Sequence, residues 1–343
     1  MAYIDTRNDE LRKLHSIYSH DISDFICKTV DNKLFNRIRD ISKNKGVEIS
    51  GFNVFPFKYS RLDHSFGVAI ILERFKQSKG HVLEALIHEL SKPSFSYSYE
   101  YLLSYFKIKD YVQPQLDKNI VNDSISADEI KAYSEYNGDY FLGFADFPYL
   151  SADNLEFILS NGYLTGLLDI KEIEDIYNNV SILLNEEGNE EFGFTDIRIA
   201  ESFFKLSIEI GKRNRSYEAK ITKRLIADVL MLMMRREEIS IDDLFIHSDI
   251  ELIELGMSSS DVRIREGWEE IANLNKVFTK FSPTNDPKKY CVKVEEPSIY
   301  IDPLVKTKAG TFRLSSINNN IEHDIVTYLE TDTDMYMYID YEL

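Results

Sequence analysis

The chain has 343 residues, of which 43% are hydrophobic and 13% aromatic, and its 58 acidic and 40 basic residues give a formal net charge of -18. This composition is sufficient for a sizeable buried core and excludes an intrinsically disordered chain. Because an acidic surface repels phosphate backbones, binding to DNA or RNA is not expected, and the basic segment 211–220 is interpreted as a solvated helix face.

The cysteine count and the distribution of apolar residues restrict the cellular setting. Cys27 and Cys291 are too few for a disulfide framework and form no CxxC pair for zinc. The first residues, MAYIDTRNDELRK, contain no apolar segment typical of a secretory signal. No run approaches the roughly 18 apolar residues that a membrane span needs. The sequence therefore predicts a cytoplasmic protein without a membrane segment.

Helical periodicity dominates the chain up to about residue 275. Apolar residues recur every three to four positions, which is the spacing of one helix face. The pattern predicts helices over 66–75, 82–90, 154–159, 197–210 and 220–236. Residues 107–140 are polar and rich in tyrosine, which indicates an insertion or lid, and 184–193 indicate an acidic turn.

From about residue 285 the pattern changes to alternating β-branched and aromatic residues interrupted by Pro and Gly, which predicts short strands. The last dozen residues, DTDMYMYIDYEL, are predicted to be an edge strand or a tail that contacts a partner. The fold class predicted is mostly α with a small α+β C-terminal portion. Its parts are a helical core over 1–180, a helical extension packed on the core over 181–280, and a strand-containing region over 281–343.

Two histidines stand in settings where they can bind a metal. His64 lies where the polar segment SRLDH opens an apolar helix, and His88 lies in ALIHELS, directly followed by Glu89. Two neighbouring helices that carry His and His-Glu can supply three ligands, and a distant carboxylate can supply a fourth. Imidazole and carboxylate together suit first-row transition metals better than Mg²⁺. The alternative is a core histidine beside a glutamate at a helix end.

Three ordered blocks, RLDHSFGV (61–68), ALIHELSKPSFSYSYE (85–100) and SADNLEFILSNGYLTGL (151–167), resemble the HD-domain superfamily. More narrowly, they resemble its deoxynucleoside triphosphate triphosphohydrolase branch. That family reads approximately R-x-x-H-S-x-G-V, then L-x-H-D-x-G-H-G-P-F-S-H-x-x-E, then D-R-x-D-Y-x-x-R-D-x-Y-x-T-G. Segments 17–42, 197–236 and 301–305 are similar to its opening, later helices and closing region.

The resemblance implies an HD-type helical core and a metal quartet, in which Glu89 replaces the family's Asp and extends the carboxylate by one methylene. A divalent ion is implied, with Mn, Fe, Mg, Zn and Ni not distinguished. The quartet falls on His64, His88, Glu89 and Asp153.

The residues that assist the family's reaction differ more. Its two further histidines correspond to Lys92 and Tyr97, so neutral-pH proton-transfer groups are replaced there. In the third block, Phe157 stands where the family has Tyr. Ser160 and Asn161 stand where the family has an Arg-Asp pair. The resemblance implies catalytic roles for Arg61, Lys92 and Tyr97, and substrate contacts for Arg61, Lys92, Phe157, Asn161 and Tyr163.

Two functions are compatible with these residues. The first is a metal-dependent phosphohydrolase that uses a metal-activated water to cleave a phosphoester or phosphoanhydride in a nucleotide or related molecule. The second is a catalytically degenerate HD-domain protein that binds a nucleotide or a protein partner as a sensor or assembly subunit. The resemblance also implies a homo-oligomer, a dimer or higher.

Overall fold

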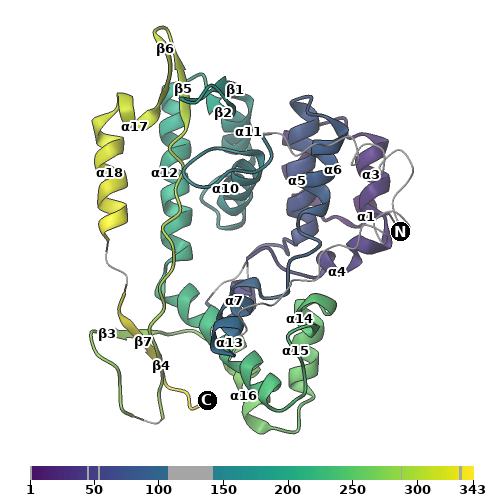
Figure 1. Ribbon diagram of the computed structural model, residues 1–343, viewed down its shortest axis with the longest axis vertical. Coiled ribbons are helices and arrows are strands. Elements are labelled where there is room, and N and C mark those ends of the chain that lie inside the picture. Colours follow the sequence, from purple (N-terminus) through teal and green to yellow (C-terminus); the bar gives the residue numbers. More distant parts are fainter. Residues whose placement is uncertain (1, 45, 53–54, 107–141, 287, 332–333) are drawn as a thin grey trace.

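The computed structural model describes residues 2–44, 46–52, 55–106, 142–286, 288–331 and 334–343. Helices make up most of this structure, and two small sheets lie toward the C-terminal part (Figure 1). The predicted fold class, mostly α with a small α+β C-terminal portion, is confirmed. The predicted insertion at 107–140 lies outside the described residues.

Many helices begin where a short polar side chain accepts a hydrogen bond from a backbone N–H of the first turn, which otherwise has no partner inside the helix. Ser60 and Asp63 form a reciprocal capping box at the start of α5 (Arg61–Arg74). Ser248 and Glu251 form a capping box at the start of α15 (Asp249–Met257). Single side chains cap other helices, namely Asn8 for α2 (Asp9–Tyr18), Ser23 for α3 (Asp24–Val30), Ser78 for α6 (Lys79–Ile87), Ser151 for α10 (Ala152–Leu164) and Ser216 for α13 (Tyr217–Arg235).

The first hydrophobic cluster surrounds α5 (Arg61–Arg74), in which every residue from Arg61 to Leu72 is buried. Because α5 is covered on all sides, its N-terminal turn is held in one position. The other helices that contribute to this cluster are α1 (Tyr3–Thr6), α2 (Asp9–Tyr18), α3 (Asp24–Val30), α4 (Asn36–Arg39), α6 (Lys79–Ile87), α10 (Ala152–Leu164), α11 (Ile170–Asn178) and α12 (Ile197–Asn214).

A second hydrophobic cluster surrounds α13, below the first in Figure 1. It contains Trp268, Phe95 and Met337, which come from distant parts of the sequence. Its elements are α7 (Ser96–Tyr105), α13 (Tyr217–Arg235), α14 (Asp243–Ile246), α15 (Asp249–Met257), α16 (Val262–Asn273) and the strands β4 (Tyr290–Val292) and β7 (Tyr336–Ile339). Strand β3 (Phe278–Lys280) pairs with β7.

The four-stranded sheet, at the top of Figure 1, has the order β1-β2-β5-β6. Strands β2 and β5 are parallel, and the other neighbouring pairs are antiparallel. Between β4 and β5 the chain runs beside α12 (Figure 1), where the Ile301 N–H donates to Ser207 Oγ over 3.0 Å. The C-terminal region thus reaches both clusters. The strands of the four-stranded sheet are β1 (Val180–Leu184), β2 (Glu190–Phe194), β5 (Leu304–Thr307) and β6 (Gly310–Arg313), and α17 (Leu314–Ile317) and α18 (Asn319–Glu330) follow β6.

The helices predicted around 66–75, 82–90, 154–159, 197–210 and 220–236 are present as α5, α6, α10, α12 and α13. The prediction of an acidic turn over 184–193 was too wide, because its flanks pair as β1 and β2 and leave 185–189 as the turn. The prediction of an edge strand at the C-terminus was wrong. Strand β7 lies between β3 and β4 and pairs with both, since Met337 and Ile339 fill the second cluster.

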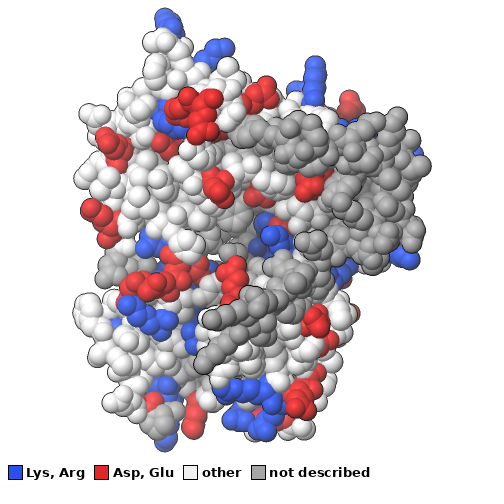
Figure 2. Space-filling view, in the orientation of Figure 1, with Lys and Arg blue, Asp and Glu red and all other residues white. Residues whose placement is uncertain are grey.

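None of the described helices is both long and apolar enough to cross a bilayer. Cys27 and Cys291 are free thiols. On the face shown in Figure 2, acidic and basic side chains of the described residues are interspersed.

Candidate metal centre

His64 lies in the first turns of α5, where the Ser60 cap fixes the helix start. Its side chain is fully buried. The Nδ1 atom faces a carboxylate oxygen of Glu156, and the Nε2 atom lies 2.8 Å from Asp153 Oδ1. Both ring nitrogens of His64 thus face a carboxylate, with Nδ1 toward Glu156 and Nε2 toward Asp153.

His88 caps the C-terminus of α6. Its Nδ1 donates to the Ala85 carbonyl oxygen over 2.7 Å, so the lone pair of the neutral ring is on Nε2. That Nε2 atom is buried and has no hydrogen-bond partner among the described residues, although it lies 3.3 Å from Glu89 Oε1 and 3.6 Å from Asp153 Oδ1. Burial lowers the pKa of His88, but Asp153 and Glu89 outweigh it and raise the pKa to about 9.

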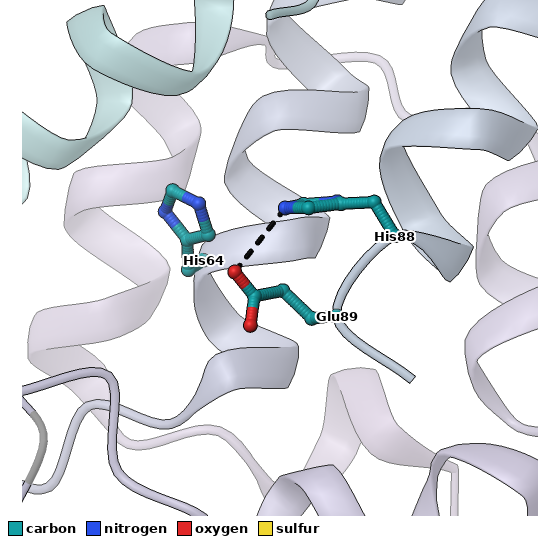
Figure 3. Close-up of side chains that lie close together, drawn as sticks. All are labelled: His64, His88 and Glu89. Carbon is teal, nitrogen blue, oxygen red and sulfur yellow. Dashed lines mark ion pairs between the residues drawn. The ribbon is translucent and has the colours of Figure 1, made fainter. Parts of the chain in front are cut away.

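His64, His88 and Glu89 each offer a ligand atom within 4.8 Å of the others. Figure 3 shows the three side chains pointing toward one another from α5 and from the end of α6. The donors are two imidazoles and a carboxylate, which is a set that divalent transition metals accept.

Glu89 contacts two cations as well as His88. Lys43 Nζ lies 2.9 Å from Glu89 Oε1, and the Arg61 guanidinium donates to the other oxygen. Burial raises the pKa of Glu89, but Lys43 and Arg61 outweigh it and hold the pKa well below its usual range. Glu89 is therefore a charged, buried carboxylate whose two oxygens are both in use.

Asp153 comes from the first turn of α10, just after the Ser151 cap. Burial raises the pKa of Asp153, but His64 outweighs it and holds the pKa well below its usual range. A carboxylate in the first turn is also stabilised by the helix dipole. Asp153 Oδ1 thus lies 2.8 Å from His64 Nε2 and 3.6 Å from His88 Nε2, so the fourth residue that the sequence nominated for the quartet adjoins both histidines.

Glu156, one turn after Asp153, is a part of this centre that the sequence analysis missed. It is fully buried, and its second oxygen accepts a hydrogen bond from Tyr59. Gly67 leaves room for it, because a Cβ there would lie 2.8 Å from Glu156 Cγ. The spacing of Asp153 and Glu156, three residues apart on one helix face, was the available signal.

A cavity of about 350 Å³ opens beside the centre and is lined by Glu89, Asp153 and Phe157 among others. Four cationic residues also line it, namely Lys43, Arg61, Lys92 and Lys223. Lys223 comes from α13, and its buried Nζ lies 2.8 Å from Glu296 Oε1. Lys43 and Lys223 were not singled out in the sequence, because nothing in their local segments differs from ordinary surface lysines.

Three other predicted site residues, Tyr97, Asn161 and Tyr163, are not among the described residues that line this cavity. The ring of Tyr97 contacts Lys223, which does line the cavity. Asn161 lines a neighbouring cavity. Tyr163 donates a hydrogen bond to Glu10 and its ring lies 5.6 Å from that of Phe57.

The side chains fit a metal ion. The buried Nε2 atom of His88 faces Glu89 and Asp153 and has no hydrogen-bond partner among the described residues, and it offers a lone pair to a metal ion once the ring, whose pKa is raised to about 9, loses its proton. His64 is oriented by Glu156 in the way that metal-bound imidazoles usually are. His64, His88 and Glu89 can therefore hold a metal ion, whose identity the donor types leave open.

No family model and no curated protein sequence matches the chain. Among solved structures, a phosphohydrolase from Bacteroides thetaiotaomicron VPI-5482 aligns over 94% of this chain and 96% of its own, with a TM-score of 0.61 and 12% identity. The chain shares its fold with a phosphohydrolase. A hypothetical protein from Aquifex aeolicus aligns over 93% of both chains, with a TM-score of 0.56 and 16% identity. At these identities the likeness concerns the fold.

Proposed function

We propose that the protein is a metal-dependent phosphohydrolase of the HD-domain superfamily that cleaves a phosphoester or phosphoanhydride bond in a nucleotide or related molecule. One observation carries the proposal: His64, His88, Glu89 and Asp153 converge beside a cavity that four cationic side chains line. The shared fold with the Bacteroides phosphohydrolase supports it.

The metal would be held by His64, His88, Glu89 and Asp153, and it would supply Lewis-acid activation of water and of a phosphoryl oxygen. The chain's own lysine and arginine residues supply positive charge that can balance the negative charge of a phosphate group. Lys92 and Lys223 enter the cavity wall from different elements and can neutralise phosphate oxygens. Glu156 and the Ala85 carbonyl engage the Nδ1 atoms of His64 and His88, and both Nε2 atoms then face Asp153.

The sequence blocks that resemble the deoxynucleoside triphosphate triphosphohydrolase branch favour a nucleotide as substrate. The roles proposed for Arg61, Tyr97, Asn161 and Tyr163 in catalysis or substrate contact rest on that resemblance. A homo-oligomer, dimer or higher, is proposed on the same basis, and analytical ultracentrifugation of the purified protein tests it.

A second function, binding without cleavage, is favoured by the contacts of Glu89. Lys43 and Arg61 already neutralise this carboxylate, so the centre can remain folded without a metal ion. In that case the cavity would bind a nucleotide as a sensor or assembly subunit does.

The test is metal analysis and phosphate or tripolyphosphate release from a nucleotide panel with Mn²⁺, Fe²⁺ or Mg²⁺. We expect bound metal, and turnover that falls to background in His64→Ala and His88→Ala. His323→Ala, which changes an exposed histidine on α18, is the matched control and should keep the full rate. Absence of both metal and turnover overturns the hydrolase proposal. Nucleotide binding that survives in both site variants without any turnover favours the sensor.

A further inference from the structure

The segment that leads into α10, and so toward Asp153, is held by the four-stranded sheet, which lies above α10 in Figure 1. The Leu150 N–H donates to Glu191 Oε1 over 3.1 Å, and the Phe192 N–H donates to the Leu150 carbonyl oxygen over 3.2 Å. Strand β2 thus binds both backbone polar groups of Leu150, three residues before Asp153. The sheet therefore fixes the point at which the chain enters α10.

Glu191 is enclosed at this contact, because its side chain is only 1% exposed, and a buried carboxylate needs a cationic partner. Arg313, the last residue of β6, is that partner. Its Nη1 and Nη2 atoms donate to the two carboxylate oxygens of Glu191 over 2.6 Å each. Two parallel bonds of this kind fix the orientation of both groups. Since Oε1 of Glu191 also accepts from Leu150, Arg313 sets where the acceptor for Leu150 lies.

The guanidinium of Arg313 is itself fixed by several neighbours. Its Nε and Nη2 atoms donate to Glu186, in the turn between β1 and β2, over 2.9 and 3.0 Å. Its Nη1 atom also donates to the Asp302 carbonyl oxygen over 3.1 Å, and the Asp302 N–H donates to the Pro148 carbonyl oxygen over 3.0 Å. Its Cζ atom lies 4.8 Å from the centre of the Tyr149 ring. One arginine thus joins β6 and the β1–β2 turn to the segment before α10.

The first turn of α10 depends on the same loop. The Ala152 N–H donates to the Leu142 carbonyl oxygen over 2.8 Å, and the Asp153 N–H donates to the Gly143 carbonyl oxygen over 3.0 Å. These bonds close the loop 142–151 at the start of the helix. A shift of Leu150 therefore changes the backbone position of Asp153.

The metal centre tolerates little displacement of Asp153, whose Oδ1 atom lies 2.8 Å from His64 Nε2 and 3.6 Å from His88 Nε2. Metal–ligand distances vary by only about 0.2 Å. A misplacement of about 1 Å that originates far from a site can cost on the order of 100-fold in its function. Glu191 and Arg313 are not among the described residues that line the cavity, so α10 is their connection to the centre.

Building on the proposed function, we infer that Glu191 and Arg313 are positioning residues for the metal centre, which hold Asp153 in place through Leu150. The C-terminal hairpin β5–β6 thereby controls the affinity for the metal ion without contributing a ligand.

Calorimetric titration of the full-length, metal-free protein with Mn²⁺ tests this inference. We expect Arg313→Met to weaken Mn²⁺ binding by about tenfold or more, because the Glu191 carboxylate is then unpaired and Leu150 shifts. Arg313→Lys should restore most of the affinity, since lysine keeps the charge but not the two parallel bonds. Arg198→Met is the matched control. It removes an arginine that is 84% exposed from its pair with Asp196 and should stay within about twofold of the wild type.

A double-mutant cycle tests the path through Glu191. Glu191→Ala and the double variant should bind Mn²⁺ about as weakly as Arg313→Met, because all three break one contact. Additive losses would contradict this path. Unchanged Mn²⁺ affinity in folded Arg313→Met overturns the inference and leaves the phosphohydrolase proposal standing.

Hydrogen exchange of the metal-free protein separates positioning from general stability. In Arg313→Met the amides of residues 150–154 should exchange about tenfold faster, while those of 66–72 in α5 keep their rate. Equal acceleration in both segments overturns the inference, because the pair would then only stabilise the fold. If Arg313→Met does not fold, Arg313→Lys decides by the same two readouts. If the wild type binds no Mn²⁺, the metal-dependent function fails, and exchange alone decides whether the pair positions Asp153.

Discussion

The carboxylate of Glu156 lies against Nδ1 of His64, and both side chains are fully buried between α10 and α5. The other carboxylate oxygen is held by Tyr59. A carboxylate in this position orients the imidazole and increases its basicity toward a metal. Glu156 thus positions His64 from the Nδ1 side of the ring.

We therefore expect Glu156→Gln to weaken Mn²⁺ binding by about 10- to 100-fold, which is the usual cost of losing such a partner. The amide can present N–H to Nδ1 and so favours the tautomer whose proton is on Nε2. Isothermal titration measures the affinity. Tyr59→Phe keeps the Glu156 carboxylate and should have a smaller effect, and an unchanged affinity in Glu156→Gln would show that His64 needs no such support.

Gly67 provides the space that Glu156 occupies, since a Cβ at this position would lie 2.8 Å from Glu156 Cγ. We expect Gly67→Ala to reduce the free energy of unfolding by about 1–3 kcal/mol, because the added methyl overpacks a rigid core. Urea denaturation measures the change. The cost should become smaller in the background of Glu156→Ala, where the neighbour is shorter. Additive effects in this double-mutant cycle would contradict a direct contact.

Glu89 is the counter-ion of Lys43 and Arg61 in the buried wall of the cavity. Glu89→Gln leaves these cations without a carboxylate, and we expect a loss of about 3–5 kcal/mol in the unfolding free energy of the metal-free protein. Chemical denaturation with chelator present measures it. Glu100→Gln, at an exposed acid on the same cavity, is the control and should change stability by less than about 0.5 kcal/mol.

Asp249, at the start of α15, is buried and accepts hydrogen bonds from the backbone N–H groups of Ser42 and Phe95. Burial raises its pKa to about 6, although the Ser42 hydrogen bond opposes this. The pKa of the Asp249 carboxyl is lower in the unfolded chain, so the unfolded chain loses this proton first as the pH rises. Stability from this group is complete below about pH 4 and is lost as the pH rises to about 6.

We expect the unfolding free energy of the wild type to fall by about 3 kcal/mol or less over this interval, as a shift of about two pKa units implies. Asp249→Asn should remove this contribution, because the amide does not ionise. Urea denaturation at several pH values compares the two proteins. A wild-type curve and an Asp249→Asn curve of the same shape would contradict the raised pKa.

The sequence by itself determined the helices that carry the centre. Local periodicity and capping residues such as Ser60 and Ser151 act within a few residues, so α5, α6 and α10 could be predicted. The adjacency of His88 and Glu89 and the similarity of three blocks to a known superfamily nominated four ligands.

The tertiary structure alone decided which groups surround those ligands. Lys43, Glu156 and Lys223 reach the site because segments separated by tens to hundreds of residues pack together, and the local sequences of the two lysines carry no sign of it. Strand β7 is central because Met337 and Ile339 bury in a cluster built by α13 and α16, whereas its sequence alone resembles an exposed edge. Long-range contacts of this kind depend on the summed burial of many side chains, which no local pattern contains.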